Sequence, residues 1–409
     1  MVYTTNENEV ISILMMLVLY ATTYIYILSQ IKLNLPKHIL FFLAVALRIG
    51  FTITDTYFFS LPHSGMDSVM FENHANTLLN GSLSLSMYNY DNYPKFIYLI
   101  YLLIGRKPLV IRAINGCLSL ITANLVYKSI LKISGDRGKS SDGMLLFLLF
   151  PQSLIFSSII MRESLIVFFA TLSVWLFINY VYSKKMLDLF TSLLCLLLGS
   201  LFHSGIILIA AAYFFFILIE KNKTKNNISI KKAVIIMTMV ILSIWVLSNS
   251  DIFLRKFHFI TSLESIIDRI NYTNTIQVGS GYLNNYTINS FGDLILYVPL
   301  KIVYFLFSPM IWDIRGLQDL IAILFDSVFY LVLTINVIAA FFGKCLNKRE
   351  RLLIKALIFA CVLVIGAYSM GTIAAGTAIR HRYKVLSFLI IITFTQSCGI
   401  IRSFFFDRK

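Results

Sequence analysis

The stretch LIKALIFACVLVIGAY, residues 353–368, shows what kind of protein this chain forms. With its flanking residues it is long and apolar enough to cross about 30 Å of hydrocarbon as one helix. Comparable apolar runs recur along the chain, among them VIIMTMVILSIWVL at 234–247. The alternating pattern of barrel strands is missing from the sequence. The sequence therefore predicts an all-α polytopic integral membrane protein with about ten transmembrane helices, each near the length needed to span a bilayer.

Composition supports this class. Of the 409 residues, 58% are hydrophobic and 13% charged, whereas soluble domains are about 25% charged. The net charge of +15 does not indicate nucleic-acid binding, because most Lys and Arg residues lie between apolar runs, where they orient helices and meet lipid headgroups. The five cysteines show no spacing typical of a metal site or a disulfide framework.

The distribution of basic residues predicts the topology, since cytoplasmic loops are enriched in Lys and Arg. We expect one transmembrane domain, residues 1–409, with outer loops at about 60–93, 248–293 and 371–384. The run 94–105 is too short to span, and the run 294–312 is broken by Pro299 and Pro309. These two segments are predicted to be re-entrant or to lie on the membrane surface.

The first outer loop contains the acidic candidates. It reads HSGMDSVMFENHANTLLNGS at 63–82, and Asp67 and Phe71 have the spacing of one helix face. Asp67 and Glu72 are therefore placed on an amphipathic helix at the membrane surface. A carboxylate at the mouth of an apolar cavity can keep a raised pKa and act as general base on a sugar hydroxyl. A solvated helix N-terminus, with Asp67 near the N-cap, explains the same pattern equally well.

The last outer loop contains a basic cluster on the side of the membrane where the charge rule disfavours it. The segment GTIAAGTAIRHRYK, residues 371–384, includes Arg380, His381 and Arg382. Two guanidinium groups there suit a lipid-linked phosphate or pyrophosphate. A plain charge anchor is the alternative interpretation, and the orientation rule counts against it.

Four further residues at predicted outer boundaries are candidates for substrate or phosphate binding. Arg112 could neutralise a phosphate or anchor to lipid headgroups. Adjacent Arg162 and Glu163 could pair with Asp67 or a ligand, or could cap a helix hairpin. His203 lies at another outer turn, where a lone histidine is more often structural.

Several of these features occur in the order found in a known family. The chain resembles GT-C membrane glycosyltransferases that use polyprenyl-phosphate-linked sugars, the bacterial relatives of protein O-mannosyltransferases and aminoarabinose transferases. The resemblance rests on four motifs, G-M-D-x-x-x-F-x-x-x-A at 65–75, Y-P with G-R-K-P-x-x-x-R-x-x-N within 93–115, F-P with R-E-S within 150–164, and G-x-x-x-R-H-R-Y at 376–383. The chain departs from the family pattern at Ser68, Phe71 and Lys95, where an acidic residue, tyrosine and proline are usual.

The resemblance implies a GT-C-like fold and inverting transfer of a sugar. Asp67 would deprotonate the acceptor hydroxyl, and Arg380 and Arg382 would hold the departing polyprenyl phosphate. The implied partners are a polyprenyl-linked sugar donor, a glycan acceptor and membrane lipids. The implied location is the bacterial inner membrane, with the active site facing the periplasm. The sequence predicts no metal site, and it leaves open whether a divalent cation takes part.

The composition is also similar to that of O-antigen and capsule cluster proteins, so a repeat-unit polymerase and a single-sugar transferase both remain open. A transporter or a flippase for lipid-linked oligosaccharides is the alternative from another class. It would show inverted repeats and charges near the midplane of the membrane. Arg48 and Asp55 are charges within one predicted span, and no repeat is visible in the sequence. His63 near Asp67 also keeps an acyltransferase open.

Overall fold

The computed structural model describes residues 9–82, 91–224, 263–276, 278–284, 286–343 and 346–396. The regular structure in these ranges is helical, and one isolated β-bridge joins Gly281 to Ala374. The expected crossing at 233–247 and the first part of the expected loop at 248–293 lie outside the described residues, as do residues 83–90.

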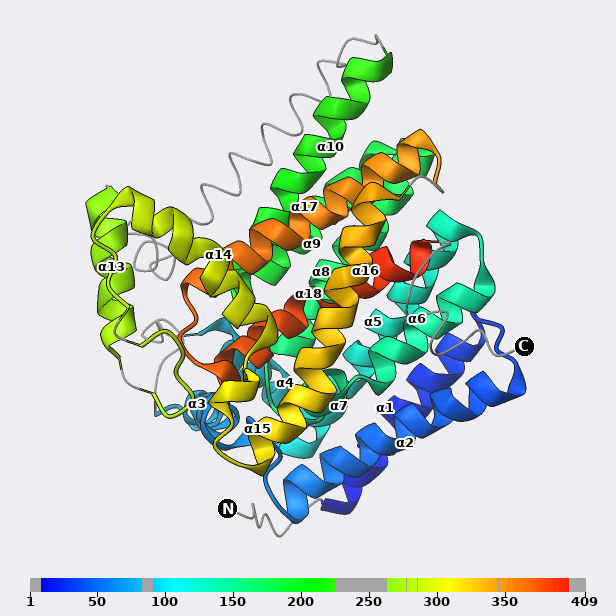
Figure 1. Cartoon of the computed structure of the whole chain (residues 1–409). Coiled ribbons are helices and arrows are strands. Elements are labelled where there is room, and N and C mark those ends of the chain that lie inside the picture. Colours follow the sequence, from blue (N-terminus) through cyan, green and yellow to red (C-terminus); the bar gives the residue numbers. More distant parts are fainter. Residues whose placement is uncertain are drawn as a thin grey trace. The chain divides into compact units, whose positions relative to one another are not determined.

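Six helical segments in the described part of the chain are long and apolar enough to cross a membrane, so the protein is an all-α membrane protein (Figure 1). They are α1 (Glu9–Leu28), α2 (Leu35–Tyr57), α5 (Pro108–Ser134), α8 (Glu163–Ser183), the continuous run Leu317–Phe342 and α17 (Lys348–Met370). A seventh span results if the bent pair α6 (Arg137–Leu149) and α7 (Pro151–Ser158) crosses as one. The shorter apolar helices are α9 (Met186–Phe202) and the segment Ser204–Glu220. The expected count of about ten, and a GT-C-like arrangement, stay predictions.

The described helices form two compact units. Unit 1 comprises Met1–Trp175 with Leu201–His203, and unit 2 comprises Leu176–Ser200 with Ser204–Lys409. The single transmembrane domain expected from the sequence stays a prediction, since one membrane domain can contain two such units. Each unit is described by itself.

Unit 1 is built around α5, most of whose residues are buried. α1, α2, α6 and α7 pack against it. A Cβ atom added to Gly116 on α5 would lie 1.9 Å from the hydroxyl oxygen of Tyr20 on α1, so only glycine permits this close approach. A π-helical turn, Ser64–Ser68, leads into α3 (Val69–Leu79), which packs against α4 (Asn92–Ile104).

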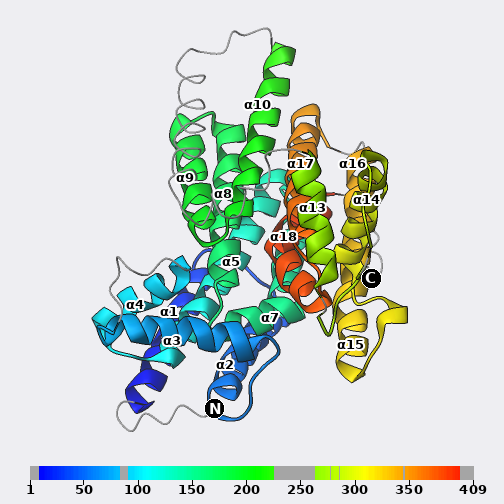
Figure 2. The same ribbon diagram turned by 90° about the vertical axis from the view of Figure 1, so that its left-hand side faces the viewer.

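Unit 2 is centred on α17 and α18 (Ala375–Thr395), which run side by side in both views (Figures 1 and 2). Besides the end of α8 and most of α9, the elements described in this unit are η2 (Ser204–Leu208), α10 (Ile209–Thr224), α13 (Leu263–Thr275), α14 (Phe291–Phe307), η3 (Ile311–Asp313), α15 (Leu317–Ala322), η4 (Ile323–Ser327) and α16 (Val328–Phe342). α14 packs against α16, α17 and α18. A short loop segment pairs with the residue just before α18 through the isolated β-bridge between Gly281 and Ala374.

Local sequence signals explain the main helix boundaries. Pro151 forces Phe150 into an extended conformation, so the chain bends by 56° between α6 and α7. Asn347 and Glu350 form a capping box that starts α17. Ser290 and Asp293 form another at the start of α14, and the hydrogen bonds from Asn289 and Ser290 lower the pKa of the exposed Asp293 carboxyl.

The start of α18 differs from the expectation. The sequence indicated an outer loop at about 371–384, whereas the structure begins a helix at Ala375. Arg380, His381 and Arg382 therefore lie on the first turns of a helix. Arg382 can be helical and buried because groups from other elements of unit 2 contact its guanidinium, as shown below, and His381 packs on Tyr368 of α17.

Candidate functional site

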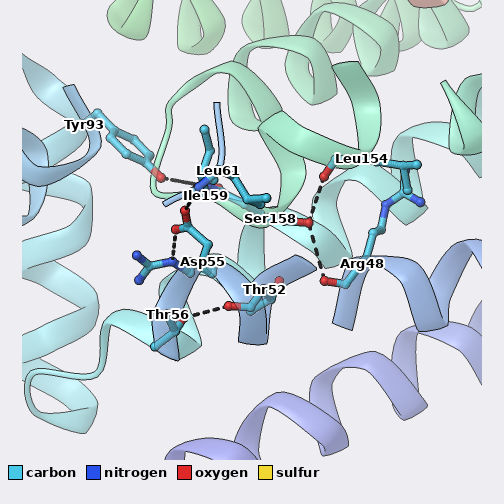
Figure 3. Close-up of polar contacts among 11 residues, drawn as sticks. Arg48, Thr52, Asp55, Thr56, Leu61, Tyr93, Leu154, Ser158 and Ile159 are labelled. Carbon is cyan, nitrogen blue, oxygen red and sulfur yellow. Dashed lines mark hydrogen bonds and ion pairs between the residues drawn. The ribbon is translucent and has the colours of Figure 1, made fainter. Parts of the chain in front are cut away.

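A buried ion pair joins the end of α2 to the beginning of α5 in unit 1. Arg112 donates from Nε to Oδ2 of Asp55 over 2.9 Å, and both side chains are at most 4% exposed. The other carboxylate oxygen of Asp55 accepts a 2.9 Å hydrogen bond from the backbone N–H of Leu61 (Figure 3). The pair thus fixes the first residues of the loop that leads to Asp67.

A second buried connection ties three segments together at the same end of α5. Asn115 donates to the carbonyl oxygens of Ile159 and Met161, and to the hydroxyl of Tyr93 at the start of α4. Burial raises the pKa of Tyr93 above its usual range, and the nearby Glu163 carboxylate acts in the same direction. The phenol therefore remains protonated. Tyr93 also lies near Arg112, so the two connections belong to one polar cluster.

Asp67 lies on the π-helical turn that precedes α3 and is half-buried. Phe71, about one turn further along the chain, is buried, and its ring contacts Tyr93 of α4 and Arg162 just before α8. Its ring centroid lies 5.3 Å from that of Tyr93 and 5.7 Å from the guanidinium carbon of Arg162. His63, just before this turn, adopts a left-handed backbone conformation with φ of 69°, which is uncommon for a residue with a side chain.

Glu72 is held in a bidentate ion pair. Arg106 donates from Nε and a terminal nitrogen to the two carboxylate oxygens over 2.8 and 3.0 Å, and the Tyr101 hydroxyl adds a 3.3 Å hydrogen bond. The carboxylate of Glu72 is only 1% exposed. This geometry suits an anchor that attaches α3 to the loop after α4 better than a general base, which must reach a substrate proton.

The remaining predicted residues of unit 1 lie around this cluster. Arg162 forms an ion pair with Asp91 at the N-cap of α4, and Glu163 next to it is fully buried. His203 is half-buried in the segment Leu201–His203, and Asn92 donates to the Leu201 carbonyl in that segment. Unit 1 thus brings Arg112, Arg162 and Glu163 around Phe71 and Tyr93, and Asp67 lies about one turn before Phe71.

The predicted basic residues of unit 2 have two different environments. Arg382 is fully buried, and its guanidinium contacts the carboxylate of Asp326, the carbonyls of Leu306 and Ser308, and the face of Tyr330. These contacts occupy most of its donors. His381 stacks on Tyr368 and accepts a 2.7 Å hydrogen bond from Lys384. Arg380 is half-buried on the same helix.

Four residues of the two units with notable buried contacts or burial were not among the predicted site residues. Asp55 was noted as a charge within a span, but its partner Arg112 is distant in sequence. Tyr93 and Asn115 were visible as parts of motifs. Lys301 is a single lysine within the apolar run of α14, and this sequence pattern could have indicated a buried cation in unit 2.

No group of three or more His, Cys, Asp or Glu side chains in the described ranges is arranged to hold a metal ion. A role for a divalent cation stays a prediction. No protein-family model matches the chain, and no curated protein is significantly similar to it.

Proposed function

We propose that the protein is a membrane glycosyltransferase. It would transfer a sugar from a polyprenyl-phosphate or pyrophosphate carrier to a glycan or lipid-linked acceptor, at the outer face of the bacterial inner membrane. The product would belong to a surface polysaccharide such as O-antigen or capsule, and a repeat-unit polymerase is one form of this activity. The observation that carries the proposal is the half-buried Asp67 about one turn before Phe71, whose ring contacts Tyr93 and Arg162 of a polar cluster that includes Arg112 and Glu163.

The reaction needs a base within reach of a hydroxyl and a cation near the leaving phosphate. Asp67 takes the proton of the acceptor hydroxyl, whose oxygen forms the new bond to the anomeric carbon. The bond between that carbon and the carrier phosphate breaks, and the electron pair leaves with the phosphate. In this scheme Glu72 is a positioning residue, because Arg106 and Tyr101 hold its carboxylate.

A buried lysine of unit 2 gives separate support for an anionic substrate. Lys301 is 1% exposed and its ammonium nitrogen has no hydrogen-bond partner among the described residues, whereas the buried Arg382 pairs with Asp326. A buried cation without a carboxylate partner is costly unless an anion compensates it. A lipid-linked phosphate has the required charge.

Transfer by the purified protein in nanodiscs tests this proposal. The donors would be polyprenyl-phosphate and polyprenyl-pyrophosphate sugars, and the acceptors would be lipid-linked glycans from the same organism. We expect transfer by the wild type and none by Asp67→Asn, with Lys225→Ala as a variant that retains activity. Normal transfer by Asp67→Asn would refute the role of Asp67.

A transporter or flippase is the second candidate, because Arg48 is a fully buried charge in the middle of the candidate span α2. Its guanidinium donates to the Ala44 carbonyl and to the hydroxyls of Ser119 and Ser153. These bonds join α2 to α5 and α7. Movement of a labelled lipid-linked oligosaccharide across proteoliposomes that lack an acceptor would favour this candidate over glycosyl transfer.

A further inference from the structure

Lys301 on α14 is a cation of unit 2 that is buried in a largely apolar helix. The residue is 1% exposed, and its ammonium nitrogen has no hydrogen-bond partner among the described residues. Its nearest aromatic neighbours are Tyr282 and Tyr297, whose ring centroids lie 5.0 and 5.5 Å from Nζ. Two ring faces stabilise an ammonium group only in part, since each contributes far less than hydration does.

Two further buried hydroxyls of this region of unit 2 also lack hydrogen-bond partners among the described residues. They are the hydroxyls of Tyr282 and Ser308, residues that are 4% and 0% exposed. Arg382 connects them, because it lies close enough to Tyr282 to influence its hydroxyl and it donates to the Ser308 carbonyl. A lysine amine and two hydroxyls are all hydrogen-bond donors. The buried ammonium requires an acceptor with negative charge, and the same acceptor can take hydrogen bonds from the two hydroxyls.

The loop that carries Tyr282 closes this region. Tyr282 donates from its backbone N–H to the Ile373 carbonyl, and Ala375 donates to the Ser280 carbonyl, so two backbone hydrogen bonds attach the loop to the start of α18. The ring of Tyr282 stacks on Tyr304 of α14 at 5.4 Å. The ring of Tyr282 thus holds this loop against both Lys301 and Tyr304 of α14.

The hydroxyl of Tyr297 is satisfied in a different way. It donates to the side-chain oxygen of Asn274 on α13 over 2.8 Å, and its ring packs with Ile270 and Ile288. Tyr297 thus holds the described part of the outer loop in place and offers the lysine only its ring face. Burial lowers the pKa of the Lys301 amine to about 8, so the amine is still mostly protonated at neutral pH.

We propose that Lys301, with the hydroxyls of Tyr282 and Ser308, forms a binding site for the phosphate group of a lipid. This inference deepens the proposed function, on which the identity of the lipid as a polyprenyl carrier rests. The phosphate supplies the negative charge and the acceptors that the three donors lack. Arg382 lies beside the site as a positioning residue, since Asp326 and the carbonyls occupy its guanidinium.

Native mass spectrometry of the detergent-purified full chain tests this site directly. The probes are polyprenyl monophosphate and phosphatidylglycerol, each titrated into wild type, Lys301→Met and Lys348→Met. Lys348 is an exposed lysine of unit 2, so its substitution makes the same change of charge outside the site. We expect Lys301→Met to weaken binding about tenfold to a hundredfold, the value of one charge-assisted hydrogen bond, and Lys348→Met to leave it unchanged.

Each outcome has a defined meaning. Lys301-dependent binding of the polyprenyl phosphate alone supports a carrier site, and equal dependence for both lipids supports a phosphate site that accepts ordinary headgroups. Unchanged binding by Lys301→Met, or no binding of either lipid to the wild type, overturns the proposal.

Thermal stability gives a second readout that keeps the test decisive if a variant binds poorly for other reasons. Without lipid, Lys301→Met should melt at a higher temperature than the wild type, because it removes an uncompensated buried charge. With lipid at the same concentration, it should be stabilised less than the wild type. A lower melting temperature without lipid would mean that Lys301 is a structural residue.

The proposal and the function of the whole protein can fail separately. Asp67→Asn should bind lipid phosphate as the wild type does while it transfers no sugar. If the protein binds lipid phosphate through Lys301 but has no transferase activity, the proposed phosphate site stands and the proposed glycosyltransferase function is refuted.

Discussion

Substitution of Arg112 by methionine would leave the Asp55 carboxylate buried with one remaining hydrogen bond, from the Leu61 N–H. Both partners are nearly inaccessible, at 0% and 4% exposure. Removing one partner of such a pair typically costs about 3–5 kcal/mol in the free energy of unfolding. We expect Arg112→Met and Asp55→Asn each to lose stability in this range.

The double variant distinguishes a buried pair from two independent residues. Removing both charges together avoids the stranded ion, so the loss should be smaller than the sum of the single losses by about 1–3 kcal/mol. Denaturant titration in mixed detergent micelles measures the three values. The more exposed pair Arg349–Glu220, at 3.2 Å, is the matched control. Its cycle should give no more than about 1 kcal/mol. Additive losses at Asp55 and Arg112 would contradict the reasoning.

The same variants decide what Arg112 contributes to function. If Arg112 mainly holds the loop before Asp67, Arg112→Met protein that is kept folded at low temperature should retain part of its transfer activity. If Arg112 binds the substrate phosphate, folded protein should be inactive and should show a weaker affinity for the donor.

Three further predictions concern other contacts. Glu72→Gln and Arg106→Met should each lower the melting temperature and should be non-additive in combination, because the two residues share one bidentate pair; independent effects on thermal unfolding would refute the anchor role. Gly116→Ala should cost about 1–3 kcal/mol through overpacking, and Tyr20→Phe should recover part of it, since the added Cβ meets the Tyr20 hydroxyl at 1.9 Å. Asp67→Asn should change stability by less than about 0.5 kcal/mol while it abolishes transfer, and a large drop in melting temperature would make Asp67 structural.

The helices were largely predictable from the sequence, because long apolar runs have few alternatives in a membrane. The apolar run at 317–342 is a single candidate span in the structure, whereas the bend between α6 and α7 at Pro151 was not predicted. The start of α18 was not predictable in the same way. Its arginines indicated a loop, whereas Asp326 and the carbonyls at the end of α14 allow Arg382 to be buried in a helix.

The candidate site was predictable only as a set of residue types. Asp67, Glu72, Arg112, Arg162 and Glu163 all belong to unit 1, but their partners come from segments that are distant in sequence. The ion pair of Glu72 with Arg106 and that of Asp55 with Arg112 depend on how α2, α3, α4 and α5 pack. Periodicity indicates which face of a helix is apolar, and it contains no information on which distant side chain a carboxylate meets.

Profiling of surface glycans tests the central claim, glycosyl transfer that depends on Asp67, most directly. The strains would lack the gene and carry either the wild-type copy or Asp67→Asn. The account predicts that the glycan loses long polymer or one sugar, and that only the wild type restores it. Loss of long polymer would identify a repeat-unit polymerase, and loss of one side-branch sugar a single-sugar transferase. Unchanged glycans in the deletion strain, or full restoration by Asp67→Asn, would contradict the claim.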